Sequence, residues 1–201
     1  MVEDNKNNTL TWWEKTVEYA FVVENSKGLA IAPLDGRLEE SFSDTVIKNG
    51  GKFSLIEFKR DKGCLGSERG KYDKYDIAEK ELKDYSENCH YLIYGTDSKT
   101  DFLKAQGYFS GTEITIKEIL KQGVCCQFFE EYLAILAEYK KRGGSGNGLS
   151  SVAFIINVEN TAQILTLPEM MEAFPFLELD PAQDQDQVQD LVSAPAPAPG
   201  A

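Results

Sequence analysis

Apolar and polar residues alternate on both sides of an Asn-Gly-Gly sequence at residues 49–51, in a stretch that runs from residue 43 to residue 59. This pattern predicts two β-strands joined by a tight turn, because Asn-Gly supplies the positive φ values that a type I′ hairpin needs. We expect residues 48–51 to form the turn, with Ile47 paired to Lys52. The rest of the predicted fold is arranged around this hairpin.

The register of the hairpin decides which side chains share a face. In the expected register Asp44 lies opposite Leu55, and directly paired residues share a face. Since side chains alternate along a strand, Glu57 and Lys59 join Asp44 on that face. A shift by one residue would move Asp44 to the opposite face. The hairpin is therefore expected to gather two carboxylates and one ammonium group into a single patch.

The elements that flank the hairpin follow from the spacing of the apolar residues. They are, in chain order, a helix over residues 11–23 with Thr9 or Thr11 near its cap, a strand over 29–33, the hairpin, a charged amphipathic helix over 68–86, and a buried strand over 90–95. This order of helix, three strands, helix and strand predicts an α/β fold.

The C-terminal half is expected to add helices and a pair of strands to this core. The additions are helices over residues 114–121 and 124–141, a glycine-rich connector over 143–148, strands over 152–158 and 163–167, and a short helix over 168–173. In the longer helix Phe128, Tyr132 and Leu136 recur at helical spacing. That stripe is assigned to the core, with a surface for a protein partner or a homodimer as the alternative.

Length and composition suit a single compact domain. With 201 residues and 42% hydrophobic content, we expect one domain over residues 1–177, with a core at about 9–96 and additions at about 97–177. Beyond it, five acids without any Lys or Arg, followed by Ala-Pro repeats, predict a disordered tail over residues 178–201. The chain start lacks the features of a signal peptide, and no apolar run could span a bilayer. A cytoplasmic protein that does not enter the membrane is expected.

Four cysteines and a single histidine restrict the chemistry that is available. Cys64, Cys89, Cys125 and Cys126 lack the two-residue spacing of a zinc knuckle, and adjacent cysteines in a helix are poorly placed for a disulfide. Reduced thiols are therefore expected. The one histidine, His90, excludes histidine-rich nuclease sites and is interpreted as an ordinary residue at a strand end.

Two close carboxylates beside a lysine indicate metal-dependent hydrolysis. The carboxylates repel each other, and a hard divalent cation such as Mg²⁺ relieves that repulsion through oxygen ligands. A bound cation polarises a phosphoryl oxygen and activates water, while a neighbouring lysine stabilises the negative charge that grows on the phosphate. Phosphodiester hydrolysis uses all of these contributions.

The residues Asp44, Glu57, Phe58 and Lys59 resemble the motif of the PD-(D/E)XK, or restriction-endonuclease-like, nuclease superfamily. In that motif an acid on one strand is followed by Glu-x-Lys or Asp-x-Lys on the next. The thirteen positions from Asp44 to Glu57 are similar to the spacing in the archaeal Holliday-junction resolvase branch. Ser43 stands where a proline usually precedes the first acid. The resemblance implies a restriction-endonuclease-like core of helix, three strands, helix and strand.

The resemblance also implies an acidic residue on the helix before the hairpin. Glu14 and Glu18 lie one turn apart on one face of that helix, and Glu18 is preferred because it leads into the apolar part of the segment. The implied catalytic residues are then Glu18, Asp44, Glu57 and Lys59. The three acids would hold Mg²⁺, for which Mn²⁺ is a substitute.

Basic residues near the predicted site indicate where a nucleic acid would bind. The candidates are Arg60, Lys62, Arg69, Lys71 and Lys74. The last three belong to a glycine-punctuated segment that borders the site in the superfamily, so they are expected to meet phosphates, with a solvated loop as the alternative. DNA is the expected partner, with RNA as an alternative.

The net charge of −12 argues against broad contact with nucleic acid, because proteins that hold DNA through its phosphates are usually basic. The acidic tail contributes part of this charge, and a bound cation would offset some of the rest. Two alternatives to a nuclease therefore stay open. One is a nuclease-like fold that has become a binding or regulatory module, and the other is an acidic inhibitor that mimics nucleic acid. Retention of Lys59 favours the enzyme over the idle module.

Overall fold

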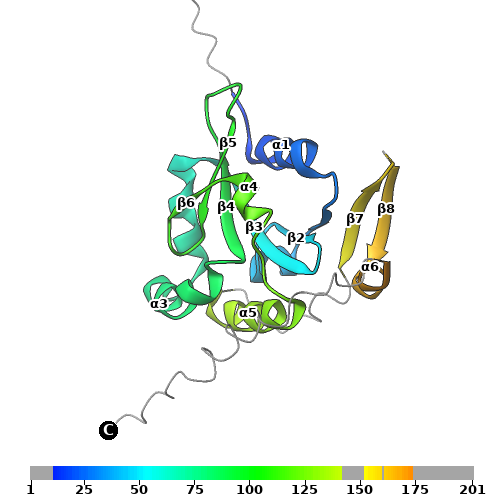
Figure 1. Ribbon diagram of the computed structural model, residues 1–201. Helices are drawn as coiled ribbons and strands as arrows, with labels where there is room; N and C mark the ends of the chain where they lie inside the picture. Colours follow the sequence, from blue (N-terminus) through cyan, green and yellow to red (C-terminus); the bar gives the residue numbers. More distant parts are fainter. Residues whose placement is uncertain (1–10, 142–151, 160, 174–201) are drawn as a thin grey trace, which may run out of the picture.

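A mixed eight-stranded sheet, in the order β6-β5-β4-β3-β2-β1-β7-β8, organises the computed structural model (Figure 1). The structure describes residues 11–141, 152–159 and 161–173. Strands β3 and β4 are parallel, and every other neighbouring pair in the sheet is antiparallel. The parallel pair is joined through a helix, as parallel strands require. The expected α/β class is therefore confirmed.

Strands and helices are interspersed along the chain. The strands are β1 (Ala30–Pro33), β2 (Thr45–Asn49), β3 (Lys52–Asp61), β4 (His90–Gly95), β5 (Leu103–Gly107), β6 (Glu113–Ile114), β7 (Ala153–Val158) and β8 (Thr161–Thr166). The helices are α1 (Glu14–Asn25), α2 (Arg37–Ser41), α3 (Tyr75–Ser86), α4 (Ile116–Ile119), α5 (Cys126–Tyr139) and α6 (Leu167–Ala173), together with the 3₁₀ helix η1 (Lys62–Lys71).

Helices cover the two faces of the sheet, and each face has its own apolar core (Figure 1). On one face Val17 and Phe21 of α1 are fully buried, and the Phe21 ring lies 5.6 Å from that of Phe58 on β3. On the other face α5 and α3 pack, and Phe129 of α5 stacks on Phe53 at 5.6 Å. Each such buried side chain contributes roughly 1.5–3 kcal/mol.

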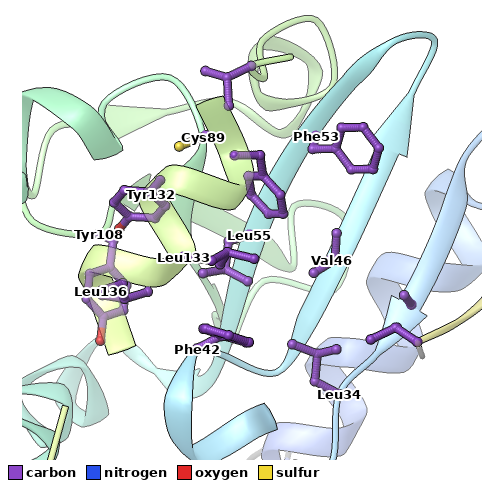
Figure 2. Close-up of a cluster of buried hydrophobic side chains, with 14 of the residues drawn as sticks. Leu34, Phe42, Val46, Phe53, Leu55, Cys89, Tyr108, Tyr132, Leu133 and Leu136 are labelled. Atoms are coloured by element: carbon purple, nitrogen blue, oxygen red, sulfur yellow. The ribbon is translucent and has the colours of Figure 1, made fainter. Parts of the chain in front are cut away.

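The core beneath α5 is built from alternate residues of the hairpin strands. Figure 2 shows side chains of β2 and β3, among them Val46, Phe53 and Leu55, in one cluster with Tyr132 and Leu133 of α5. The residues between them on the two strands face α1 instead. Because β3 is buried on both faces, a polar side chain on it is also buried unless it lies at the strand end.

The hairpin exists, but its turn and its register differ from those expected. Asn49 pairs with Lys52, so Gly50 and Gly51 form the turn, and the expected pairing of Ile47 with Lys52 is wrong. Gly50 has a φ of 58°, whereas Gly51 is not among the residues with positive φ, a combination that suits a type II′ turn rather than type I′. The side-chain amide of Asn49 donates to Leu120 O at 2.5 Å, which holds this residue in the strand.

The shift in register amounts to two residues, so the faces are unchanged. Val46 lies opposite Leu55 and Thr45 opposite Ile56. Continued by one step, this register brings Asp44, which directly precedes β2, opposite Glu57. An even shift preserves the alternation of side chains, and so the expected patch is retained with Asp44 closer to Glu57 than the sequence predicts.

All five predicted helices have different boundaries in the structure, and the first two in chain order have identifiable causes. Helix α1 begins at Glu14, with Trp13 as the N-cap, and not at Thr11. Trp12 donates its indole N–H to Arg60 O at 2.6 Å, which keeps the residues before Trp13 out of the helix. The helix expected over residues 68–86 is divided, because the buried Tyr72 is extended and forms a backbone bridge with Lys140 between η1 and α3.

Some elements were missed, and the C-terminal additions continue the sheet. No element was expected for α2, β5 and β6. Strand β7 pairs with β1 and β8 pairs with β7, so the added hairpin extends the central sheet. The connector over residues 143–148 and the tail over 178–201 lie outside the described residues. Within the described part of the chain, no helix has the length and apolar character needed to cross a membrane.

Candidate functional site

The predicted motif residues of β3 lie in a buried polar region beneath η1. Glu57 is completely buried and Lys59 is 5% exposed, and both share a strand face with Leu55. Glu57 Oε2 accepts a hydrogen bond from Ser43 Oγ at 2.6 Å, and its Oε1 accepts from Lys59 Nζ at 2.5 Å and from Lys71 Nζ at 2.6 Å. Both oxygens of this carboxylate are therefore engaged within the protein.

Lys59 and Lys71 are shared between two carboxylates, Glu57 and Glu68, and we call these four residues the charge cluster. Glu68 Oε1 lies 2.9 Å from Lys59 Nζ and 3.0 Å from Lys71 Nζ. Its hydrogen-bond geometry to both is poor, so these contacts are ion pairs. Each ammonium group therefore touches one oxygen of each carboxylate. Burial of four charges is tolerated because every charge has two opposite partners.

The charge cluster continues into a chain of buried tyrosines. Tyr108 donates its hydroxyl to Glu68 Oε2 at 2.7 Å, and Tyr72 donates to the Tyr108 hydroxyl at 3.0 Å. Burial raises the pKa of the Tyr72 and Tyr108 hydroxyls, which keeps them neutral donors. Lys140 also lies nearby, with its ammonium group bonded to Phe42 O, and burial lowers its pKa to about 8.

Asp44 stands beside the charge cluster, and among the described residues it forms no ion pair of its own. Its Oδ2 accepts the backbone N–H of Phe58 at 2.6 Å, and within the described residues its Oδ1 accepts no hydrogen bond. Burial, followed by the negative charge of Glu57, raises the pKa of Asp44 to about 7. The Asp44 carboxylate is therefore the group that an added cation would stabilise most.

The lysines outweigh burial in setting the charge of Glu57. Burial alone would raise the pKa of Glu57, but Lys71 and Lys59 hold it below the ordinary value. In the same way burial disfavours the charged form of Lys59, yet Glu57 and Glu68 raise its pKa above that of a free lysine. Glu57, Lys59 and Lys71 are therefore ionised near neutral pH.

Of the two helix acids, Glu14 lies nearer to the predicted motif. Glu14 Oε2 is 3.7 Å from Lys59 Nζ. Glu18 forms an ion pair with Lys15 at 2.6 Å, and its side chain is 14% exposed. The hydrogen bond and the charge of Glu18 raise the pKa of Lys15 against the opposing effect of burial. The charge of Asp44 adds a smaller increase, so Lys15 also interacts with Asp44. The helix therefore brings both acids to the border of the site, with only Glu14 in contact with a motif residue.

The predicted nucleic-acid-binding residues are not gathered into one basic surface. Arg60 pairs with Asp61 at 2.7 Å and Lys62 with Glu113 at 3.2 Å. Arg69 lies over the ring of Tyr75 at 4.7 Å and 3.9 Å from Asp76, and Lys74 is exposed. Lys71 differs from the others because its ammonium group points into the charge cluster, where it pairs with Glu57 and Glu68.

Sequence reasoning missed Glu68, Tyr108 and the inward position of Lys71. Glu68 was interpreted as the start of a charged helix, and no periodicity marks it as buried. The one available signal is its place among glycines after a strand that ends in a predicted site. His90 was interpreted as an ordinary strand-end residue, but it is fully buried, with Nδ1 2.6 Å from Tyr132 Oη and its ring stacked on Tyr108 at 3.7 Å. All four cysteines are unpaired, as expected.

A groove on the described surface lies next to the site and does not include it. It has a volume of about 1120 Å³ and begins at Asp61 and Lys62, just beyond the end of the motif strand. Trp12, Phe102 and the β5–β6 hairpin line it. Its lining carries more acidic than basic side chains, so it does not provide a binding surface for a phosphate backbone.

Metal ligands are fewer than a complete protein site would need. Among the described residues, no group of three or more histidine, cysteine, aspartate or glutamate side chains is arranged to hold an ion. Asp44 and Glu57 are the adjacent pair of carboxylates. Mg²⁺ often uses only one or two protein carboxylates and takes its remaining ligands from water and substrate phosphates. The donor set thus fits Mg²⁺ or Mn²⁺ better than a metal that requires a closed protein site.

Comparison with protein-family models, curated proteins and solved structures finds no match.

Proposed function

We propose that this chain is a divalent-metal-dependent nuclease of the PD-(D/E)XK, restriction-endonuclease-like type, and that it hydrolyses phosphodiester bonds in DNA. The observation that carries the proposal is the placement of Asp44 beside Glu57, with Lys59 on the same strand face and 2.5 Å from the Glu57 carboxylate. Two acids and a lysine in this arrangement match the chemical needs of phosphodiester hydrolysis.

The order of the central elements supports the same proposal. Helix α1 is followed by three strands, β1 to β3, then by helix α3 and strand β4 parallel to β3. This is the order of helix, three strands, helix and strand that the resemblance implies. The short α2 and η1 are inserted between these elements and leave the order intact.

Asp44 and Glu57 would hold Mg²⁺ or Mn²⁺, with Glu14 replacing Glu18 as the helix acid nearest to the motif lysine. The free Oδ1 of Asp44 and the repulsion between the two carboxylates fit a cation. When bound, the cation would supply Lewis acidity and an activated water. Lys59 would orient Glu57 and stabilise the negative charge that develops on the phosphate.

A cleavage assay tests the proposal. Supercoiled plasmid, linear duplex, single-stranded and branched DNA, and RNA are incubated with the full chain and Mg²⁺, Mn²⁺ or a chelator. We expect metal-dependent cleavage, its loss in Asp44→Asn and Glu57→Gln, and a fall of at least about 100-fold in Lys59→Met. Glu130→Gln and Lys121→Met, on exposed positions away from the site, are the matched controls. Cleavage that Lys59→Met leaves unchanged, or no cleavage of any substrate, would contradict the proposal.

A second candidate is a binding or regulatory module that retains a nuclease-like fold without catalysis. The observation in its favour is that both oxygens of the Glu57 carboxylate already accept hydrogen bonds, from Ser43, Lys59 and Lys71. The net charge of −12 also favours such a module, and it equally favours an inhibitor that mimics nucleic acid. The melting temperature separates these candidates from the enzyme, because they predict no specific stabilisation by Mg²⁺ or Mn²⁺ that Asp44→Asn removes.

A further inference from the structure

Lys71 occupies a place that no motif in the sequence assigns to it. Its Nζ lies 2.6 Å from Glu57 Oε1, the same oxygen that Lys59 Nζ contacts at 2.5 Å. The two ammonium groups therefore crowd onto one oxygen of a proposed metal ligand. The positive charge of Lys59 acts against the protonated form of Lys71, although burial is the larger opposing effect and Glu57 and Glu68 more than compensate.

The two lysines are not equally fixed. The Lys59 side chain is 7% exposed, whereas that of Lys71 is 33% exposed. Lys59 belongs to a central strand, and Lys71 is the last residue of η1, directly after Gly70. The carbonyl of Lys71 accepts a hydrogen bond from Lys141 N at 3.0 Å, so its backbone is anchored while its side chain borders solvent. Lys71 can therefore leave Glu57 by side-chain rotation alone.

Glu68 would keep Lys71 near the site after such a movement. Glu68 Oε1 lies 3.0 Å from Lys71 Nζ, and Glu68 is itself held by Tyr108 and by Lys59. Rotation of Lys71 away from Glu57 and toward Glu68 leaves Glu68 with both of its ammonium partners. Glu57 Oε1 then keeps one ammonium partner, Lys59, and loses one of the two positive charges that a cation would meet there.

We propose that Lys71 is a displaceable counter-ion, whose ammonium group occupies the Glu57 carboxylate in the metal-free protein and gives way when a divalent cation binds. This inference rests on the proposed function, because it concerns the same metal site. A dication added beside two ammonium groups would meet strong repulsion, and departure of one ammonium removes much of it. The metal affinity is then set by competition with an internal lysine, and the empty site is protected from an uncompensated buried charge.

Metal titration of the full chain tests this competition. Binding of Mn²⁺ and of Mg²⁺ is measured by calorimetry and by the shift in melting temperature, for wild type and for Lys71→Met. We expect Lys71→Met to bind the cation at least about 10-fold more tightly, since its competitor is gone, and to melt at a lower temperature without metal. Lys71→Gln, which retains a hydrogen-bond donor without the charge, provides the same comparison if the methionine variant does not fold. Lys80→Met, an exposed lysine of α3, is the control and should match wild type.

The outcomes separate this inference from the proposed function. Tight binding in Lys71→Met or Lys71→Gln and weaker binding in wild type support both. Binding in wild type that neither variant strengthens leaves the metal site intact and overturns the displaceable counter-ion. Absence of binding in wild type and in both variants overturns the two proposals together.

Discussion

Asp44 is ionised only at the expense of folding stability. Burial and the charge of Glu57 raise its pKa to about 7, well above that of an aspartate in an unfolded chain. Between about pH 4 and pH 7 the native state therefore binds a proton at Asp44 that the unfolded state has lost. The free energy of unfolding contributed by this group falls as the pH rises through that window, and the loss is complete above pH 7.

Replacement of Asp44 by asparagine should remove the decrease in the free energy of unfolding that ionisation of Asp44 causes. The amide oxygen can still accept the Phe58 N–H, and no charge needs to be buried. At pH 8 and without metal, we expect the free energy of unfolding of Asp44→Asn to be at least about 1.4 kcal/mol higher than that of wild type, the equivalent of one pKa unit. The difference should disappear near pH 4. Urea unfolding at several pH values measures it, and a difference independent of pH would contradict the assignment.

Some residues of the site can be grouped from the sequence by strand alternation within one hairpin, whereas others come together only in the folded chain. Asp44, Glu57 and Lys59 belong to one hairpin, and strand alternation alone places them on one face. Glu68 lies in η1, and Tyr108 directly follows β5, a strand that was not predicted, so their contact depends on tertiary packing. Glu18 was preferred over Glu14 from local hydrophobicity, which does not determine how the helix is positioned on the sheet.

The secondary-structure elements also separate into those that local sequence signals predict and those that depend on contacts between distant residues. Strong turn and alternation signals identified the hairpin and the strand at residues 90–95, and the strand after Gly28 differs by one residue at its start. Strand β5 alternates Lys104 and Gln106 with apolar residues, a pattern typical of a strand, but no strand was expected there. The division between η1 and α3 arises from the buried Tyr72, whose backbone bridge to Lys140 joins residues far apart in the chain.

A close approach of backbones fixes the segment between α4 and α5 onto the start of β3. Phe53 and Val124 exchange backbone hydrogen bonds of 2.8 and 3.1 Å. The preceding Gly123 has a φ of 114°, and a Cβ there would lie 2.9 Å from Lys52 Cβ and 3.0 Å from Phe53 O. This position therefore requires glycine for both conformation and space.

Gly123→Ala should destabilise the protein by at least about 2 kcal/mol, because either the turn or β3 must shift. Gly66→Ala in η1 is the control, since a Cβ there meets nothing within 4 Å and the backbone is not in the left-handed region. We expect the control to remain within about 0.5 kcal/mol of wild type. Urea midpoints that coincide for the two variants would show that the approach at Gly123 is not tight in solution.

For the molecule as a whole, charge is the property that most constrains function. The chain carries 33 acidic and 21 basic residues, and five of the acids follow residue 177. The exposed basic side chains near the site are mostly paired with acids, so they offer little attraction to a phosphate backbone. The proposed nuclease should therefore bind nucleic acid weakly by itself and would depend on the proposed metal, or on a partner protein, for affinity.

Deletion of residues 180–201 should have little effect on folding. The segment carries acids, glutamines and Ala-Pro repeats, a composition that buries little apolar surface. We expect the melting temperature of the shortened chain to stay within about 2 °C of the full chain, since a larger shift would need about 0.5–1 kcal/mol of lost contacts. Differential scanning calorimetry of both forms measures the two melting temperatures. A decrease of several degrees in the shortened chain would show that residues 180–201 pack on the rest of the domain.

The anchoring of Trp12 next to the site makes its intrinsic fluorescence a reporter of structural change at the end of the motif strand. The chain has two tryptophans: Trp13 is 68% exposed, whereas Trp12 lies against Phe102 and donates to the carbonyl of Arg60, the residue after Lys59. In Trp13→Phe, the intrinsic fluorescence would come from a single indole fastened to the end of the motif strand. Any rearrangement of Lys59 and its neighbours that moves this carbonyl would change the emission. Such a rearrangement can thus be followed in real time with no added dye.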